Sequence, residues 1–263
     1  MKEILNILSI SKTFSLNKKQ RKLESHPYRK KTVLNKLSFS VKQGEIFGLL
    51  GPNGAGKTTS MRIIVGLIKS DSGDVFVDGS NVSKHLMEIR QKIGFLSENF
   101  RLEDFFTPNY LFDFFSALRN IPKKNAQKRK DLLFDYFGIK DFAQKRIATL
   151  SNGMRQKVSL ALSIVHDPSI IILDEPTNGL DIAASKMIVD FLLEMKKQGK
   201  TIVISTHILG LAEKICDRVG IIIDGKMVLC DSLSQITEKA TLEDTFFSFY
   251  KEYHVHKELR ITQ

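Results

Sequence analysis

The sequence predicts a mixed α/β fold, on three observations. Short apolar runs rich in β-branched residues recur along the 263-residue chain, close together at first and later alternating with helix-like stretches. A glycine-rich loop at residues 51–59 joins one apolar run to a helix-like stretch, and another apolar run, Ile170–Leu173, ends in two acids. With 42% hydrophobic residues, the chain can bury a large core, either as one domain or as a core with a subdomain.

Strands are expected at nine places, each a short apolar run. They cover residues 3–10, 34–41, 45–50, 75–78, 92–96, 169–174, 201–205, 219–223 and 227–230. Helical spacing is clearest after Asp181, the expected N-cap, in four apolar residues: Ile188, Phe191, Leu192 and Met195. Between Glu98 and Leu150 the pattern is helical and aromatic, so we expect most of these rings to form a core and a few to be exposed.

The glycine-rich loop, Gly51–Thr59, predicts a cradle for nucleotide phosphates. Its glycines allow backbone torsions and a close approach that a Cβ would block, and the following helix adds the positive end of its dipole. Lys57 would reach the β- and γ-phosphates, and the Thr58 hydroxyl would ligate Mg²⁺. The alternative is a chance glycine-rich turn, which the flanking strand and helix make rare. The expected nucleotide contacts are Asn53, Gly54, Ala55, Gly56, Lys57, Thr58 and Thr59.

The two acids after Ile170–Leu173 predict hydrolytic chemistry. A continuous apolar run suits a strand buried on both faces of a parallel sheet, whose end would lie beside the phosphate loop. Asp174 would then hold Mg²⁺ through water, and Glu175 would polarise the water that attacks the γ-phosphate. Without the phosphate loop, a core strand followed by a solvated acidic turn would be the better interpretation.

Two further segments carry weaker signals. Ser151, with Gly153 close by, opens a helix-like stretch, and a serine at a helix N-terminus can bind an anion, although such caps are common. His207 follows the β-branched run Thr201–Ile204, so it would sit at the carboxyl end of a strand, where open α/β sheets place ligands. A lone histidine there is more often a satisfied surface residue.

In this order, the segments resemble the ATP-binding cassette (ABC) family. Leu150–Lys157 resembles the family signature, usually written LSGGQ, and Pro176–Asp181 looks like the stretch leading to its D-loop aspartate. Ser205–His207 looks like its switch histidine. The resemblance spans most of residues 1–250 and implies a P-loop NTPase core of the ABC ATPase type, with an N-terminal antiparallel β-subdomain and an inserted helical subdomain.

The resemblance also implies the domain limits and the roles of the site residues. Residues 1–240 would form the ATPase domain, with 99–150 as the inserted helical subdomain and 241–263 as a short C-terminal helical extension. In this family the signature of one subunit closes on the ATP held by another, so two ATPs lie in a head-to-tail dimer. Ser151, Gly153 and Asp181 would therefore contact ATP, and the catalytic residues would be Glu175, His207 and Lys57.

Some positions depart from the family pattern. Glu98 stands where the family usually has a glutamine that bridges Mg²⁺ and the membrane partner, and a carboxylate can still contact the metal site. Asn152 and Met154 replace residues of the usual signature, as in export-type relatives. For the aromatic residue that stacks on adenine, Phe14 matches the local pattern, and Tyr28 is its rival because an insertion displaces the usual spacing.

Composition favours a cytosolic protein that borrows its membrane association from a partner. We find no run of ~18 apolar residues, no secretory signal, and two isolated cysteines that suggest a reducing compartment. Between Asn17 and Lys31, seven basic residues and one acid supply +6 of the formal charge of +11. That insertion could contact anionic lipid or nucleic acid, but a solvated loop is the favoured interpretation.

Taken together, these features predict an ATP- and Mg²⁺-dependent ATPase subunit of a bacterial-type exporter. It would act as a homodimer or heterodimer on separate polytopic permease subunits, peripherally at the cytoplasmic face of the inner membrane. The end of the chain supports export, since Leu242–Asp244 and the Phe-rich stretch after it resemble the extension of export-type subunits. The alternative is a soluble ABC ATPase acting on ribosomes or nucleic acid. Family members of that kind usually carry two cassettes in one chain, or a long coiled coil between the phosphate loop and the signature. This chain has a single cassette and only a short interval from Thr59 to Leu150, so no nucleic acid is expected as a partner.

Overall fold

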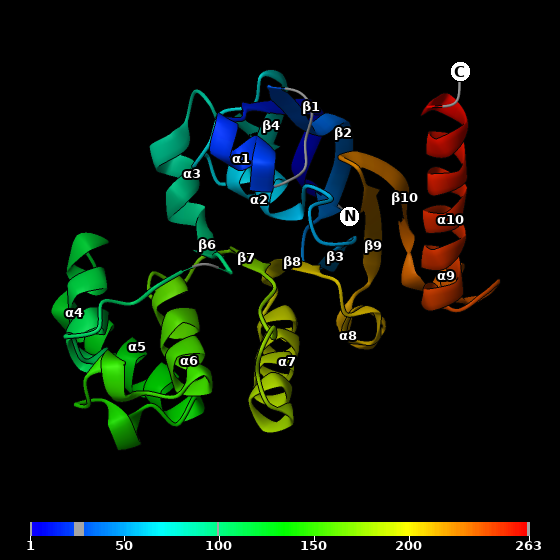
Figure 1. The fold of residues 1–263 in the computed structure, drawn as a ribbon. Coiled ribbons are helices and arrows are strands. Elements are labelled where there is room, and N and C mark those ends of the chain that lie inside the picture. The colour runs from blue at the N-terminus through cyan, green and yellow to red at the C-terminus, as the bar shows by residue number, and fades with distance from the viewer. Residues whose placement is uncertain (1, 24–28, 99, 262–263) are drawn as a thin grey trace. The chain divides into compact units, whose positions relative to one another are not determined.

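The computed structural model describes residues 2–23, 29–98 and 100–261. The chain forms two compact units, one joining Met1–Ile89 to Val203–Gln263 and the other covering Arg90–Ile202 (Figure 1). Strands lie at all nine expected places, with one additional short strand, Ser80–Asn81. The predicted α/β class is therefore confirmed.

The elements of the first unit precede and follow the second unit along the chain. Before it come β1 (Glu3–Ser15), α1 (Lys18–Leu23), β2 (Lys30–Lys42), β3 (Ile46–Leu50), α2 (Lys57–Ile64), β4 (Ser72–Val77), β5 (Ser80–Asn81) and α3 (Leu86–Lys92), which runs into the second unit. After it come β8 (Thr201–Thr206), α8 (Leu209–Ile215), β9 (Arg218–Ile223), β10 (Lys226–Ser232), α9 (Leu233–Thr237) and α10 (Leu242–Ile261). The second unit holds β6 (Ile93–Leu96), α4 (Pro108–Leu118), α5 (Lys123–Tyr136), the 3₁₀ turns η1 (Lys140–Phe142) and η2 (Ile147–Thr149), α6 (Asn152–Ser163), β7 (Ile170–Asp174) and α7 (Ile182–Lys197).

One sheet of the first unit is antiparallel, with the strand order β2-β1-β4-β5. β1 and β2 are longer than predicted, and their pairing runs from Glu3↔Lys42 to Ser15↔Lys30. The predicted strand ended at Ile10, which the structure shows to be the last buried apolar residue of β1. Beyond it, backbone pairing continues without a buried face, which an apolar pattern cannot reveal.

The other strands of the first unit follow the order β10-β9-β3-β8. β3 and β9 run parallel, with Leu50 opposite Ile221, and β9 and β10 form an antiparallel pair. All five residues of β3 are buried, as expected for a strand covered on both faces. After Leu50 the chain therefore leaves the sheet from a buried strand that has a neighbouring strand on each side.

The second unit combines a parallel strand pair with helices. β6 and β7 are in register from Ile93↔Ile170 to Leu96↔Leu173, so their carboxyl ends meet. The helices pack through aromatic contacts, with ring centroids 5.4 Å apart for Phe112 and Phe134 and 4.9 Å for Phe137 and Phe191. α4 starts with Pro108 after a Thr107 cap whose side chain accepts a bond from the Tyr110 N–H.

The C-terminal helix α10 is anchored at its start. The Thr241 hydroxyl accepts a bond from the Asp244 N–H at 3.0 Å, and Leu242, which is fully buried, donates its N–H to Glu213 at 3.2 Å. α10 contacts α8, α9 and β9. No helix within the described residues combines the length and the apolar character needed to cross a membrane.

Both cysteines lie in the first unit as thiols. Cys216 is buried against Gly48, where an added Cβ would come within 2.8 Å of its Sγ. Cys230 is half-buried, 3.6 Å from an Arg218 nitrogen. Burial raises the pKa of the Cys230 thiol, although the Arg218 charge opposes this.

Candidate active site

The phosphate loop requires its glycines. Gly54 and Gly56 have φ values of +82° and +108°, in the left-handed region that side chains disfavour. A Cβ on Gly51 would lie 2.3 Å from the Ile222 carbonyl oxygen, and one on Gly56 would lie 2.6 Å from Leu34. The loop is therefore folded closely against its neighbours, with backbone alone at the points where a side chain would clash.

Lys57 opens α2 and is buried within the loop. Its Nζ donates to the carbonyl oxygens of Gly51 at 2.7 Å and Pro52 at 3.3 Å. Gly56 precedes it as an N-cap without a side-chain cap, so the first N–H groups of α2 face no capping side chain. Such a helix start, with a cation at its first position, is a binding site for an anion.

The remaining loop residues line the same turn. Asn53 is exposed, Thr58 and Thr59 are half-buried, and Ala55 is buried. The Gly225 N–H donates to the Ala55 carbonyl at 2.9 Å, and the Gly225 carbonyl accepts from the Asn35 N–H at 2.9 Å. The β9–β10 turn thus connects the phosphate loop to β2.

Phe14 pairs with β2, the strand that packs against this loop. It stands opposite Lys31 in the β1–β2 pair, shortly before Val33 and Leu34, which an added Cβ on Gly56 would meet. The ring is 37% exposed, so it offers a face on which a base could stack. Tyr28, the rival, lies outside the described residues, and the adenine contact of Phe14 stays a prediction.

His207 follows β8, the sheet neighbour of β3 in the first unit. It is exposed, directly after the buried Ser205 and Thr206. The Thr206 hydroxyl accepts a bond from the Ile208 N–H at 3.0 Å, which fixes the backbone turn that carries the histidine. Its predicted position after a strand end is confirmed, and its phosphate contact stays a prediction.

In the second unit, Asp174 ends β7 and Glu175 follows it. Both are buried, at 1% and 7% exposure. Glu175 has a φ of +49°, a left-handed conformation that costs a non-glycine residue roughly 1 kcal/mol or more. No residue type around Glu175 predicts this backbone conformation.

Glu98 lies at the same sheet edge as these acids, since β6 and β7 are parallel and in register. It is exposed, and its Oε1 accepts a bond from Asn178 Nδ2 at 3.0 Å. The Gln156 side chain donates to the Pro176 carbonyl at 3.0 Å. Sequence reasoning missed Asn178 and Gln156, whose contacts join segments that are far apart along the chain.

Ser151 and Asp181 begin the two helices α6 and α7. The Ser151 hydroxyl accepts from the Met154 N–H at 3.3 Å, and Asp181 Oδ1 accepts from the Ala184 N–H at 2.7 Å. The prediction that Asp181 is the N-cap of α7 is therefore confirmed. A Cβ on Gly153 would meet only the Ala184 Cβ, at an ordinary 3.6 Å, so packing within the chain does not require a glycine there.

The oxygen donors of the predicted site suit a hard cation. Thr58 supplies a hydroxyl in the first unit, and Asp174 and Glu98 supply carboxylates in the second. Mg²⁺ prefers such oxygen ligands and usually completes its shell with water and phosphate oxygens. Each unit therefore supplies oxygen donors of the type that Mg²⁺ prefers.

Relatives with this sequence pattern carry ABC names. Residues 34–178 match the family model described as ABC transporter. The chain is 36% identical over 224 residues to the ABC transporter ATP-binding protein NatA of Bacillus subtilis, covering 84% of this chain and 91% of NatA. It is 35% identical over 201 residues to the Nod factor export ATP-binding protein I of Ralstonia nicotianae, covering 76% of this chain and 63% of that protein.

Solved structures agree with these matches. The structure of an ATP binding subunit of an ABC transporter superposes with a TM-score of 0.79 and 26% identity, covering 93% of this chain and 98% of that one. The dimeric post-hydrolysis structure of the ATP-binding cassette MJ0796 with ADP and Pi gives a TM-score of 0.75 and 26% identity, covering 87% and 98%. The chain therefore belongs to the ABC transporter family, as one of its ATP-hydrolysing cassettes.

Proposed function

We propose that this chain is the ATP-hydrolysing subunit of an export-type ABC transporter. The observation that carries the proposal is the phosphate loop, in which left-handed glycines and the buried Lys57 form the start of α2. The export direction is supported by relatives named for Nod factor export and for linearmycin resistance. In this proposal the chain sits peripherally at the cytoplasmic face of the inner membrane.

Hydrolysis would use residues of both units. Lys57 and the N–H groups of the loop would hold the β- and γ-phosphates of ATP. Mg²⁺, held by Thr58, Asp174 and Glu98, would neutralise charge on the phosphates. Glu175 would orient the attacking water and take its proton, and His207 would contact the γ-phosphate.

Two copies, or one copy and a close relative, would enclose the ATP. Ser151, Gly153 and Asp181 would contact the nucleotide held by the other subunit. The sequence has glycine at 153 although packing within the chain leaves ordinary space for a Cβ. A glycine that the chain itself does not need supports close approach by an external group.

The test is the Glu175→Gln variant. The amide keeps the size of the side chain but cannot accept the proton, so we expect ATP turnover to fall about 100-fold or more while ATP binding persists. Trapped dimers should appear in size-exclusion chromatography with ATP and Mg²⁺. The control is Glu194→Gln, a half-exposed carboxylate on α7 beside Lys197, which should turn over normally. Normal turnover by Glu175→Gln would refute the assigned role.

The membrane partner would contact an exposed aromatic patch on the second unit. We define this aromatic patch as Phe105, Phe106, Tyr110 and Phe114. Three of its rings are 49–64% exposed, and neighbouring ring centroids are 4.3–6.3 Å apart. Exposed, contiguous rings favour a protein interface, which here would take a cytoplasmic helix of the permease.

A further inference from the structure

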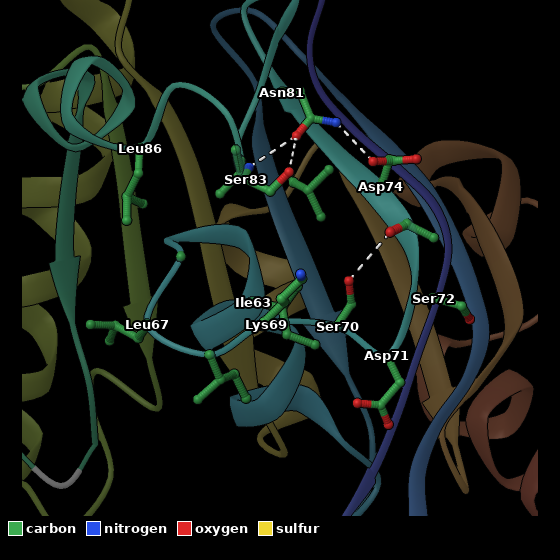
Figure 2. Close-up of a pocket in the computed structure, with 15 residues that line it drawn as sticks. Ile63, Leu67, Lys69, Ser70, Asp71, Ser72, Asp74, Asn81, Ser83 and Leu86 are labelled. Atoms are coloured by element: carbon green, nitrogen blue, oxygen red, sulfur yellow. Dashed lines mark hydrogen bonds between the residues drawn. The ribbon is translucent and has the colours of Figure 1, made fainter.

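The loop that follows α2 ends in an acidic residue with an unusual set of contacts. This loop borders a cavity of about 390 Å³ lined by residues from α2 to Leu86. Figure 2 shows Asp71 at one end of the cavity and Asp74 at the other, beside Asn81. Asp74 accepts a bond from Asn81 Nδ2 at 2.8 Å, whereas Asp71 forms its hydrogen bonds with β1.

Asp71 binds three consecutive residues of β1. Its Oδ1 accepts from Lys12 Nζ at 2.8 Å, and its Oδ2 accepts from the Thr13 N–H at 2.7 Å. Its own N–H donates to the Ser11 carbonyl at 2.8 Å. The Lys12 ammonium, followed by the Thr13 N–H, lowers the pKa of the Asp71 carboxyl, so the carboxylate is charged at neutral pH.

Lys12 in turn lies against the Phe14 ring. Its Nζ is 5.6 Å from the ring centroid, within range of a cation–π interaction. The two residues are two apart on β1 and therefore share one face of the strand. The Lys12 side chain is only 17% exposed, because the ammonium is held by the carboxylate and the ring together.

We propose that Lys12 and Asp71 are positioning residues that hold the Phe14 ring ready to stack on the adenine of ATP. The inference rests on the proposed function. A ring fixed beforehand loses less freedom when the base binds, which favours affinity. Asp71 follows α2, whose first residue is Lys57. The loop that carries Asp71 continues from α2, so the chain segment that begins in the phosphate loop also supplies the carboxylate that holds Lys12.

The experiment compares ATP with a ligand that has no base. Affinities for Mg-ATP and for inorganic tripolyphosphate are measured by calorimetry on the full chain. Phe14→Ala should weaken ATP binding about tenfold, as expected for loss of a base stack. Lys12→Met and Asp71→Ala should weaken it about two- to fivefold. Tripolyphosphate affinity should stay unchanged in all three. Lys12→Arg keeps the positive charge and should bind ATP as tightly as the unaltered chain.

The matched control is Asp74→Asn, which changes the other acid of the cavity and should leave both affinities unchanged. Equal losses for ATP and tripolyphosphate would indicate a general structural effect and overturn the inference. If Phe14→Ala weakens ATP binding but Lys12→Met and Asp71→Ala do not, the inference fails while the base site stands. If Phe14→Ala has no effect, the base site lies elsewhere and the inference also fails. ATP turnover by the unaltered chain tests the proposed function separately.

Discussion

His166 is a neutral histidine held within the second unit. Its Nε2 donates to the Ile93 carbonyl oxygen at 3.0 Å. Burial, and then the charge of Arg119, lowers its pKa to about 4, with Arg129 adding to the effect and Asp167 opposing it. The native state therefore binds a proton on His166 only as the pH falls to about 4.

This residue makes the free energy of unfolding depend on pH. Between pH 6.5 and about 4, the unfolded chain binds a proton that the native state rejects, so stability falls as pH falls. We expect His166→Gln to remove the pH-dependent contribution of this residue to the free energy of unfolding, which is roughly 1 kcal/mol between pH 7 and pH 5 after allowance for partial exposure. Urea unfolding of both proteins at these two pH values measures it. An equal pH effect in both proteins would contradict the prediction.

At this scale, the sequence identified residues by type and spacing but not by contact. Lys57, Asp174 and Glu175 could be found because each lies directly at the end of an apolar run or in a glycine-rich loop. The Lys12–Asp71 pair could not, since its partners lie 59 residues apart, with α1, β2, β3 and α2 between them. The left-handed backbone at Glu175 was equally hidden, because nothing in the residue types around it demands that conformation.

Among the elements, α10 has a fully buried residue at its start, and no other side chain of the helix between residues 242 and 253, where burial is described, is buried. Leu242 is 0% exposed, whereas Phe247, one turn further along, is 46% exposed. Both are apolar, so composition alone assigns them similar roles. Their difference arises from the contact of the start of α10 with α8 and α9.

We expect Leu242→Ala to lower the free energy of unfolding by about 2–4 kcal/mol, because it removes buried methyl groups and leaves a cavity. Phe247→Ala is the control, and its effect should stay below about 1 kcal/mol. Urea denaturation followed by circular dichroism gives both values. Equal losses in the two variants would mean that α10 does not pack through Leu242.

Strand positions were predictable because buried runs such as Ile46–Leu50 and Ile170–Leu173 are apolar throughout. The ends of β1 and β2 were not, since their outer pairs, such as Thr13↔Thr32, are polar or exposed. β5 was missed because two polar residues, Ser80 and Asn81, form it. Backbone pairing without side-chain burial leaves no periodic pattern.

For the whole molecule, transport requires that ATP turnover be coupled to a membrane partner. The aromatic patch is the surface proposed for that contact, and it contains none of the predicted catalytic residues. One of its rings, Phe105, also lines a cavity of about 800 Å³, whose other lining residues include Asn152, Arg155 and Asn178. A change in the aromatic patch can therefore separate coupling from hydrolysis.

We expect the double variant Phe105→Ser, Tyr110→Ser to lose association with membranes while the purified chain still hydrolyses ATP. The reason is that both rings are exposed and contribute contact area rather than core packing. Leu132→Ser, at an equally exposed apolar site on α5, is the control and should stay membrane-associated. Detergent extraction of the tagged chain from native membranes, with mass spectrometry of co-purifying proteins, is the measurement. Unchanged co-purification of a polytopic protein would refute the docking surface.

The surroundings of Cys216 and Cys230 make the chain convenient for fluorescence. Thiol-reactive dyes need access to a thiolate; Cys216 is buried, and the raised pKa of the half-buried Cys230 makes its thiolate scarce at neutral pH. A cysteine introduced at the exposed Gln144 would therefore take the dye first, in the unit that contains neither native cysteine. Energy transfer between donor- and acceptor-labelled copies would then follow, in real time, whether two chains approach when ATP is added and separate when it is spent.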